Sequence, residues 1–208
     1  MEPYSERPLS QYLDDAASGA PTPGGGSAAA LAGALAAAMA SMVGAFTLSS
    51  EKYMEAHPEA ERIRRETESL RETLTRLVQA DVDAYASVSR AHALPKTTPE
   101  EKAARREAVR DASAEALGPP LKTLRAIRGL AGLLPRLAEI GNRNLLSDAA
   151  VAAVLARAAA DAAAVNVRVN CNGLGDRDRA AALEAEVAAA CRSVHEACDA
   201  ALERVERA

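Results

Sequence analysis

The carboxylate of Asp81 lies on an apolar line of the sequence, a setting in which a carboxylate can do acid–base chemistry. Leu74 and Val88 lie seven residues to either side of it, and Leu77 and Tyr85 lie four residues to either side. Residues at these spacings share one face of a helix, so we expect the carboxylate to be buried with them. Burial raises the pKa of a carboxyl group toward the range that serves proton transfer. The alternative is a structural Asp that pairs with an Arg or bonds to a helix end.

A glycine-rich stretch, PTPGGGS at residues 21–27, lies in a segment that carries no charge between residues 16 and 50. It lacks the GKS or GKT ending of a phosphate loop and the GxGxxG spacing of a dinucleotide site. Gly24, Gly25, Gly26 and Ser27 nevertheless place free backbone N–H groups at a helix start, where they suit a carboxylate or carbonyl of a ligand. The alternative is a tight connection between crossing helices.

Two further charged features of the sequence give weaker evidence for a functional site. Lys96 belongs to a basic cluster at residues 96–106, which is either a solvated face or a surface that steers an anionic ligand. Asp161 lies seven residues after Val154 and four before Val165. For Asp161 we favour a structural role, because its neighbours are alanines rather than loop groups that could admit a ligand.

Metal and covalent catalysis find no support in the residue spacing. His57, His92 and His195 are scattered, without the HxH or HExxH pattern of a metal site. No GxSxG or CxxC motif is present, and the three cysteines form no even framework. We expect no metal site and a reducing, cytoplasmic setting. The N-terminus does not read as a secretion signal.

The elements that must position these groups are helices. Aromatic residues make up 2% of the chain and alanine dominates it, so intrinsic propensity favours helix over strand. We predict an all-α, multi-helix bundle that forms one domain over residues 1–208. The apolar periodicity and the Gly, Pro and cap signals predict helices near residues 9–19, 28–50, 58–93, 99–117, 121–140 and 147–170, and a last helix toward the C-terminus.

The uncharged helix expected at residues 28–50 is long enough to cross a membrane. It holds few strongly inserting residues and no flanking Trp, Tyr or basic anchors, so we predict instead a fully buried central helix. Its small residues would let neighbouring helices approach closely, and Ser27 would be its N-cap. The net charge of −4 gives no basic footprint for nucleic acid. We therefore expect neither a membrane nor a nucleic acid as partner.

Four segments, PTPGGGSAAALAGALAAAMASMVG, QADVDAYASVSRAHALPKTTPEEKAAR, GNRNLLSDAAVAA and NVRVN, occur together in this order. This combination resembles the cyclodeaminase/cyclohydrolase family of tetrahydrofolate enzymes. That family contains the cyclodeaminase half of formiminotransferase-cyclodeaminase and stand-alone bacterial methenyltetrahydrofolate cyclohydrolases. The resemblance runs from about Leu9 to the last helix. It implies a helical subunit that forms a homodimer, a folate bound near the subunit interface, and no metal or redox cofactor.

The resemblance also implies roles for particular residues. Asp81 matches the expected proton donor of the family. The matches to its glycine loop, its LPK lysine and its GN and SD positions are Gly24, Gly25, Gly26, Ser27, Lys96, Asn142, Ser147 and Asp148. Among the asparagines, Asn142, Asn166 and Asn170 have amides that can read the edge of a pterin, since an amide has both donors and an acceptor.

From these features we predict an enzyme of one-carbon metabolism that converts 5-formiminotetrahydrofolate to 5,10-methenyltetrahydrofolate and ammonia, with Asp81 protonating the leaving group. The alternative reaction on the same scaffold is a methenyltetrahydrofolate cyclohydrolase, which opens the methenyl ring to 10-formyltetrahydrofolate. An alternative from another class is a non-catalytic folate-binding or helical interaction protein.

Overall fold

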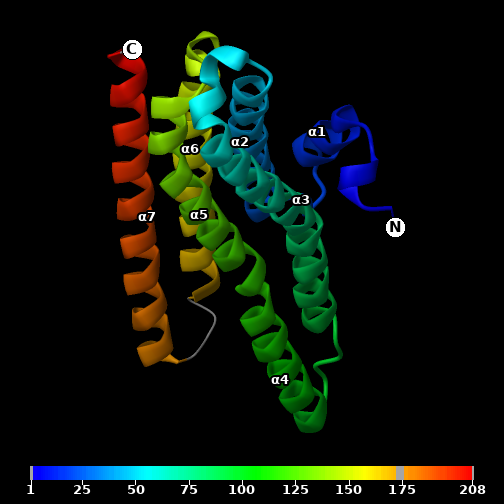
Figure 1. The fold of residues 1–208 in the computed structure, drawn as a ribbon. Coiled ribbons are helices and arrows are strands. Elements are labelled where there is room, and N and C mark those ends of the chain that lie inside the picture. The colour runs from blue at the N-terminus through cyan, green and yellow to red at the C-terminus, as the bar shows by residue number, and fades with distance from the viewer. Residues whose placement is uncertain (1, 172–175, 208) are drawn as a thin grey trace.

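In a computed structural model that describes residues 2–171 and 176–207, the chain is a bundle of helices (Figure 1). No strand occurs in these residues, which confirms the all-α prediction. The helices are α1 (Leu9–Ala17), α2 (Gly25–Leu48), α3 (His57–His92), α4 (Pro99–Ala116), α5 (Gly118–Ile140), α6 (Leu146–Cys171) and α7 (Arg177–Glu206). Three short 3₁₀ helices join them: η1 (Tyr4–Glu6), η2 (Glu51–Ala56) and η3 (Arg143–Leu145). Part of the loop predicted after residue 170 lies outside the described residues.

The packing centres on α2, which contacts α3, α5 and α6. Helix α7 packs along α5 and α6, and η1, which precedes α1, contacts α3 (Figure 1). Helices α3 and α4 form a hairpin that extends beyond the rest of the bundle at one end (Figure 1). The packing of α2 against α3 brings the start of α2 next to the middle of α3.

Small residues allow the close packing of α2. Ala30, Ala36 and Ala37 are completely buried, and a Cβ added to Gly33 would meet the side chains of Leu74 and Ile127 at 3.1 Å. The prediction of a helix buried on all sides is wrong for one stripe, however. Leu35 and Phe46 are 49% and 50% exposed, because none of the helices in residues 2–171 and 176–207 covers that face.

Two stretches, Gly25–Leu48 and Arg143–Cys171, are long and apolar enough to cross a membrane. In this fold they run along each other as α2 and α6, and both contribute buried alanines to the core.

The capping residues in the sequence predict some helix ends correctly and others incorrectly. The capping box of Thr98 and Glu101 is present at the start of α4, as predicted. Helix α5 begins at Gly118 rather than near residue 121, because Pro119 and Pro120 fit a first turn, where a missing N–H costs nothing. Helix α6 begins at Leu146, one residue before the start predicted from the sequence.

Candidate active site

A cleft of about 420 Å³ opens where the start of α2, the middle of α3 and the ends of α4 and α6 meet. The residues that line it include Thr22, Gly24, Gly25, Gly26, Asp81, Tyr85, Val88, Ser113, Asn166, Val169 and Asn170. The structure therefore gathers Asp81, the glycine loop and two of the three candidate asparagines, which are separated by up to 146 positions in the sequence.

The carboxylate of Asp81 binds the first turn of α2. Its Oδ2 atom accepts a hydrogen bond of 2.8 Å from the backbone N–H of Ser27. Helix α2 begins at Gly25, and its N-cap, Gly24, supplies no side-chain hydrogen bond. The first N–H groups of a helix have no partner within the helix and form its positive end, so a carboxylate is favourable there. The prediction that Ser27 is the N-cap is thus wrong, because Ser27 lies inside the first turn.

The glycines let the backbone approach the carboxylate. A Cβ added to Gly26 would lie 2.1 Å from Oδ1 of Asp81, which is far inside van der Waals contact. A Cβ added to Gly25 would lie 3.2 Å from Nδ2 of Asn166. At these two positions the absence of a side chain is what allows α2 to meet α3 and α6 around the cleft.

Burial raises the pKa of Asp81 above its ordinary value of 3.8, and the hydrogen bond from the Ser27 N–H opposes part of this rise. Desolvation disfavours the charged carboxylate, whereas a donated hydrogen bond favours it. Asp81 is therefore a carboxyl group that is easier to protonate than usual and that faces an open cleft. This is the property required of a group that accepts and returns a proton during turnover.

The same shift predicts a pH-dependent gain in stability for Asp81→Asn. Because the pKa is higher in the folded state than in the unfolded state, the protonated carboxyl stabilises the fold below about pH 4, and this contribution is lost as the pH rises through the folded-state pKa. Asparagine stays neutral throughout. We expect the Tm of Asp81→Asn to exceed that of the wild type by a margin that grows from acid to neutral pH. Thermal unfolding at a series of pH values measures it, and a margin independent of pH would contradict the shift.

Asn166 and Asn170 lie one turn apart near the end of α6. Nδ2 of Asn166 donates to the carbonyl oxygen of Ala162 at 2.8 Å, and Nδ2 of Asn170 donates to that of Ala116 at 2.9 Å. Within residues 2–171 and 176–207, neither Oδ1 atom accepts a hydrogen bond from the protein, so both remain acceptors for a ligand.

Several cleft residues were not predicted. Tyr85 and Val88 were assigned to the buried stripe of Asp81, yet both line the cleft, and Tyr85 is 45% exposed. One feature of the sequence could have indicated that Tyr85 lines the cleft: it is an aromatic residue one turn after a candidate catalytic acid. Ser113 of α4 and Val169 of α6 gave no signal, since their place in the cleft depends on how the helices pack.

Five predicted site residues do not line the cleft. Ser27 is one of them, since it is completely buried in the first turn of α2. The other four lie elsewhere. Lys96 is on the exposed turn after α3 and does not line the cleft. The backbone N–H of Asn142 donates to Oγ1 of Thr47 at 2.9 Å, in the last turn of α2. Thr47 lies about 30 Å along α2 from Ser27, at a rise of about 1.5 Å per residue.

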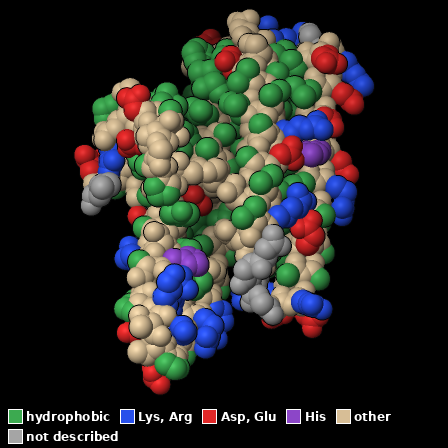
Figure 2. Space-filling view, turned by 180° about the vertical axis from the view of Figure 1, so that it is seen from behind, with side chains coloured by type: hydrophobic (Ala, Val, Ile, Leu, Met, Phe, Trp, Pro, Cys, Tyr) green, Lys and Arg blue, Asp and Glu red, His purple; other side chains and the backbone are tan. Residues whose placement is uncertain are grey.

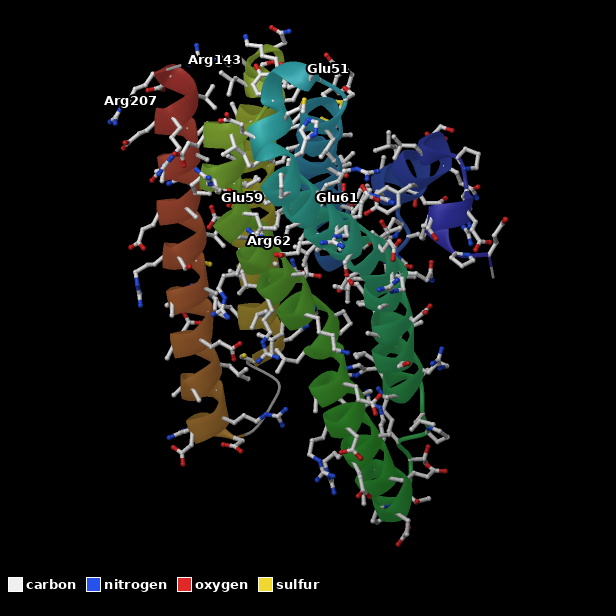
Figure 3. All side chains as sticks on the ribbon, viewed as in Figure 1. Glu51, Glu59, Glu61, Arg62, Arg143 and Arg207 are labelled. Atoms are coloured by element: carbon white, nitrogen blue, oxygen red, sulfur yellow. The ribbon has the colours of Figure 1, made fainter. Side chains whose placement is uncertain are left out.

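Ser147 and Asp148 share the Asn142 end, since they lie in the first turn of α6. Figure 3 marks this end of the molecule by Arg143, opposite the end formed by α4. Within this chain these residues therefore lie far from the cleft.

Asp161 does not lie on a buried line. It is exposed, and its Oδ1 is 2.8 Å from Nε2 of His195, which supports the structural role favoured from the sequence. In the part of the chain that the structure describes, no cluster of three or more His, Cys, Asp or Glu side chains is placed to hold a metal ion.

The chain is similar to known proteins. The family model for formiminotransferase-cyclodeaminase matches residues 8–189. A methenyltetrahydrofolate cyclohydrolase of Methylorubrum extorquens is 44% identical over 81% of each chain. The formimidoyltransferase-cyclodeaminase of Rattus norvegicus is 34% identical over 81% of this chain, which spans only 31% of that longer protein.

A solved structure is also similar. The crystal structure of a formiminotetrahydrofolate cyclodeaminase from Thermotoga maritima matches with a TM-score of 0.83 and 31% identity, over 97% of each chain. The similarity in fold and the similarity along most of the sequence point to the same family. The chain belongs to the formiminotransferase-cyclodeaminase family of folate one-carbon enzymes.

Proposed function

We propose that this protein is a methenyltetrahydrofolate cyclohydrolase, which adds water to 5,10-methenyltetrahydrofolate to form 10-formyltetrahydrofolate. The observation that carries the proposal is the Asp81 carboxyl, which lines an open cleft and has a raised pKa. From the sequence alone we predict the cyclodeaminase reaction, with the cyclohydrolase reaction as the alternative. The 44% identical relative is named as a cyclohydrolase, and this similarity favours the cyclohydrolase reaction.

The proposed chemistry requires one group that takes a proton and returns it. The Asp81 carboxylate removes a proton from water as the water oxygen bonds to the methenyl carbon. A tetrahedral intermediate forms, in which this carbon is bonded to N5, N10 and the new hydroxyl. The neutral Asp81 then protonates N5 as the carbon–N5 bond breaks, which leaves the formyl group on N10. The hydroxyl proton passes to solvent, so the step releases one proton overall.

The cleft offers contacts for both halves of a folate. The Oδ1 atoms of Asn166 and Asn170 can accept hydrogen bonds from the N–H groups of the pterin. Tyr85, Val88 and Val169 form an apolar wall for the benzoyl ring. Lys96 is too far around the turn to line the cleft, and we assign it only a long-range attraction to the carboxylates of the substrate, which salt would screen.

A specific observation favours a second reaction. The solved structure that matches 97% of this chain is named as a formiminotetrahydrofolate cyclodeaminase. In that reaction N10 attacks the formimino carbon, and ammonia leaves from the tetrahedral intermediate after protonation by Asp81. Neither reaction changes the oxidation level of the one-carbon unit, so we propose that the protein needs no redox cofactor. We also propose that it acts in the cytoplasm.

One assay distinguishes the candidates. The purified protein is given 5,10-methenyltetrahydrofolate and, separately, 5-formiminotetrahydrofolate, and the absorbance of the methenyl group is followed. Loss of absorbance from the first, above the uncatalysed rate, supports the cyclohydrolase. Gain from the second with release of ammonia supports the cyclodeaminase. No change in either would contradict both and favour a non-catalytic folate-binding protein.

We further propose that the protein is a homodimer. Helices α2 and α6 are drawn behind α3 and α5 in Figure 1, and hydrophobic side chains gather on their face in the reverse view of Figure 2. The exposed apolar residues on α2 and α6 are Leu35, Phe46, Val151, Val154, Val165 and Val169. An antiparallel pairing of these faces would bring the Asn142 end of one subunit toward the cleft of its partner. That arrangement would give Asn142, Ser147 and Asp148 a place near the substrate.

A charged residue introduced into the exposed apolar face of α2 tests whether the dimer forms there. We expect the wild type to sediment with twice the mass of the monomer and Leu35→Glu to sediment as a monomer, because burying a carboxylate in an apolar interface is costly. Leu13→Glu is the matched control, since Leu13 is 56% exposed on α1 and does not belong to the apolar face of α2 and α6. A wild type with the monomer mass would contradict the proposal.

A further inference from the structure

Helix α1 buries one side chain, that of Tyr12. Its neighbours Leu9 and Leu13 are 61% and 56% exposed, whereas Tyr12 is 6% exposed. The apolar stripe predicted for this helix is therefore not what attaches it to the bundle. Tyr12 is the contact, and it inserts a phenol hydroxyl next to the start of α2.

Two hydrogen bonds connect this hydroxyl to Asp81. The Tyr12 hydroxyl donates to Oγ of Ser27 at 3.2 Å. The backbone N–H of the same Ser27 donates to Oδ2 of Asp81 at 2.8 Å. Ser27 is completely buried, so its hydroxyl and its N–H are not exposed to water. Tyr12 and Asp81 are also close enough for the Asp81 charge to contribute to the raised pKa of Tyr12, which burial dominates.

The Tyr12 ring is itself held in place. Tyr4 packs edge-on against it, with 5.2 Å between the ring centroids. The Tyr4 hydroxyl donates to Oδ2 of Asp15 at 2.9 Å, and its backbone N–H donates to Oε1 of Gln79 at 3.1 Å. The N-terminal segment is thus fastened to both α1 and α3, and the Tyr12 hydroxyl has a fixed direction.

We propose that Tyr12 is a positioning residue for the proton transfer by Asp81, and that it acts through Ser27. This inference rests on the proposed function of Asp81. The Tyr12 hydroxyl fixes the first turn of α2, so that the Ser27 N–H stays aimed at the carboxylate. Tyr12 touches no cleft surface, because it is not among the residues that line the cleft.

The role has a distinct kinetic consequence. The groups that face Asp81 are the Ser27 N–H of α2, Tyr12 of α1 and, across the cleft, Asn166 of α6; Tyr85 lies one turn further along α3. Of these, the Ser27 N–H is the one that lowers the pKa of Asp81. Weakening it moves the titration of Asp81 to higher pH and loosens the carboxyl, while the contacts that bind substrate are unchanged.

The test compares Tyr12→Phe with Tyr4→Phe in the methenyl assay over a range of pH. Both variants lose one phenol hydroxyl from the same aromatic pair, but only the Tyr12 hydroxyl binds Ser27. For Tyr12→Phe we expect kcat to fall about tenfold, as for the loss of one hydrogen bond. We also expect KM within about twofold, and the limb of the pH profile set by Asp81 to move to higher pH. Tyr4→Phe should show neither change.

A second variant covers the case in which Tyr12→Phe folds poorly. Ser27→Ala removes the Oγ acceptor and keeps the backbone N–H. It should reproduce the effect of Tyr12→Phe, and the double variant should be no worse than either single variant, because both remove one link. If the wild type is active but the pH profile of Tyr12→Phe or of Ser27→Ala is not shifted, the positioning role alone is overturned. A wild type inactive on both folates would overturn the proposed function, and this role with it.

Discussion

Asp81→Asn is expected to lower kcat by at least about 100-fold and to leave KM within about threefold. General acid–base groups contribute about 10²–10⁴-fold to rates, and an amide can neither accept nor return a proton at neutral pH. Asparagine has the same shape and keeps an oxygen that can accept the hydrogen bond from Ser27, so the fold and the cleft should be retained. Steady-state kinetics on the preferred folate, with a circular dichroism spectrum of each variant, measures this.

Asp83→Asn is the matched control for this substitution. Asp83 lies on the same helix two residues later, is exposed, and accepts a hydrogen bond of 2.9 Å from Nε2 of Gln79 rather than from α2. Removing its charge should change kcat by less than about twofold, since exposed charges act weakly at a distance. If Asp83→Asn were impaired and Asp81→Asn were not, the proton would pass through another group.

Gly26→Ala is expected to reduce kcat/KM by about 100-fold, the scale of effect that a displacement of about 1 Å has on a catalytic group. The added methyl group would lie 2.1 Å from Oδ1 of Asp81, so the two cannot coexist. Because the clash involves the end of a side chain, the carboxyl group must rotate away from Ser27. Stability should fall by only about 1–3 kcal/mol, the usual cost of overpacking. Thermal unfolding and steady-state kinetics measure the two effects separately.

Two neighbouring glycines provide graded controls. A methyl group on Gly24 would meet nothing closer than a carbonyl oxygen at 3.8 Å, and one on Gly25 would meet Nδ2 of Asn166 at 3.2 Å. We expect Gly24→Ala to have almost full activity and Gly25→Ala to be intermediate. Equal losses in all three variants would mean that loop flexibility, rather than the approach to Asp81, explains the need for glycine.

The fold could be predicted largely from local signals. Alanine content, apolar periodicity and the Thr98–Glu101 capping box depend on neighbouring residues, and they located most helices within a few positions. The start of α2 could not be predicted in this way. Ser27 has the residue type of an N-cap, but the group that binds the first turn is a carboxylate 54 residues further along the chain.

The site was predictable in part for the same reason. Asp81 was identified because a carboxylate on an apolar stripe is conspicuous in the sequence. Tyr85 has the same periodicity but belongs to the cleft wall, and only the arrangement of α2, α3, α4 and α6 around the cleft distinguishes a cleft from a core. Asn142 was chosen by resemblance, which gives no position in space, and within this chain it lies at the far end of α2.

The most direct test of the central claim is the titration of the Asp81 carboxyl itself, followed by carbon NMR of protein labelled at aspartate and assigned with Asp81→Asn. The account predicts a midpoint above the ordinary value of 3.8, and a limb of the wild-type kcat profile at the same pH. A midpoint at or below 3.8, or an activity profile that does not follow this titration, would contradict Asp81 as the group that transfers the proton.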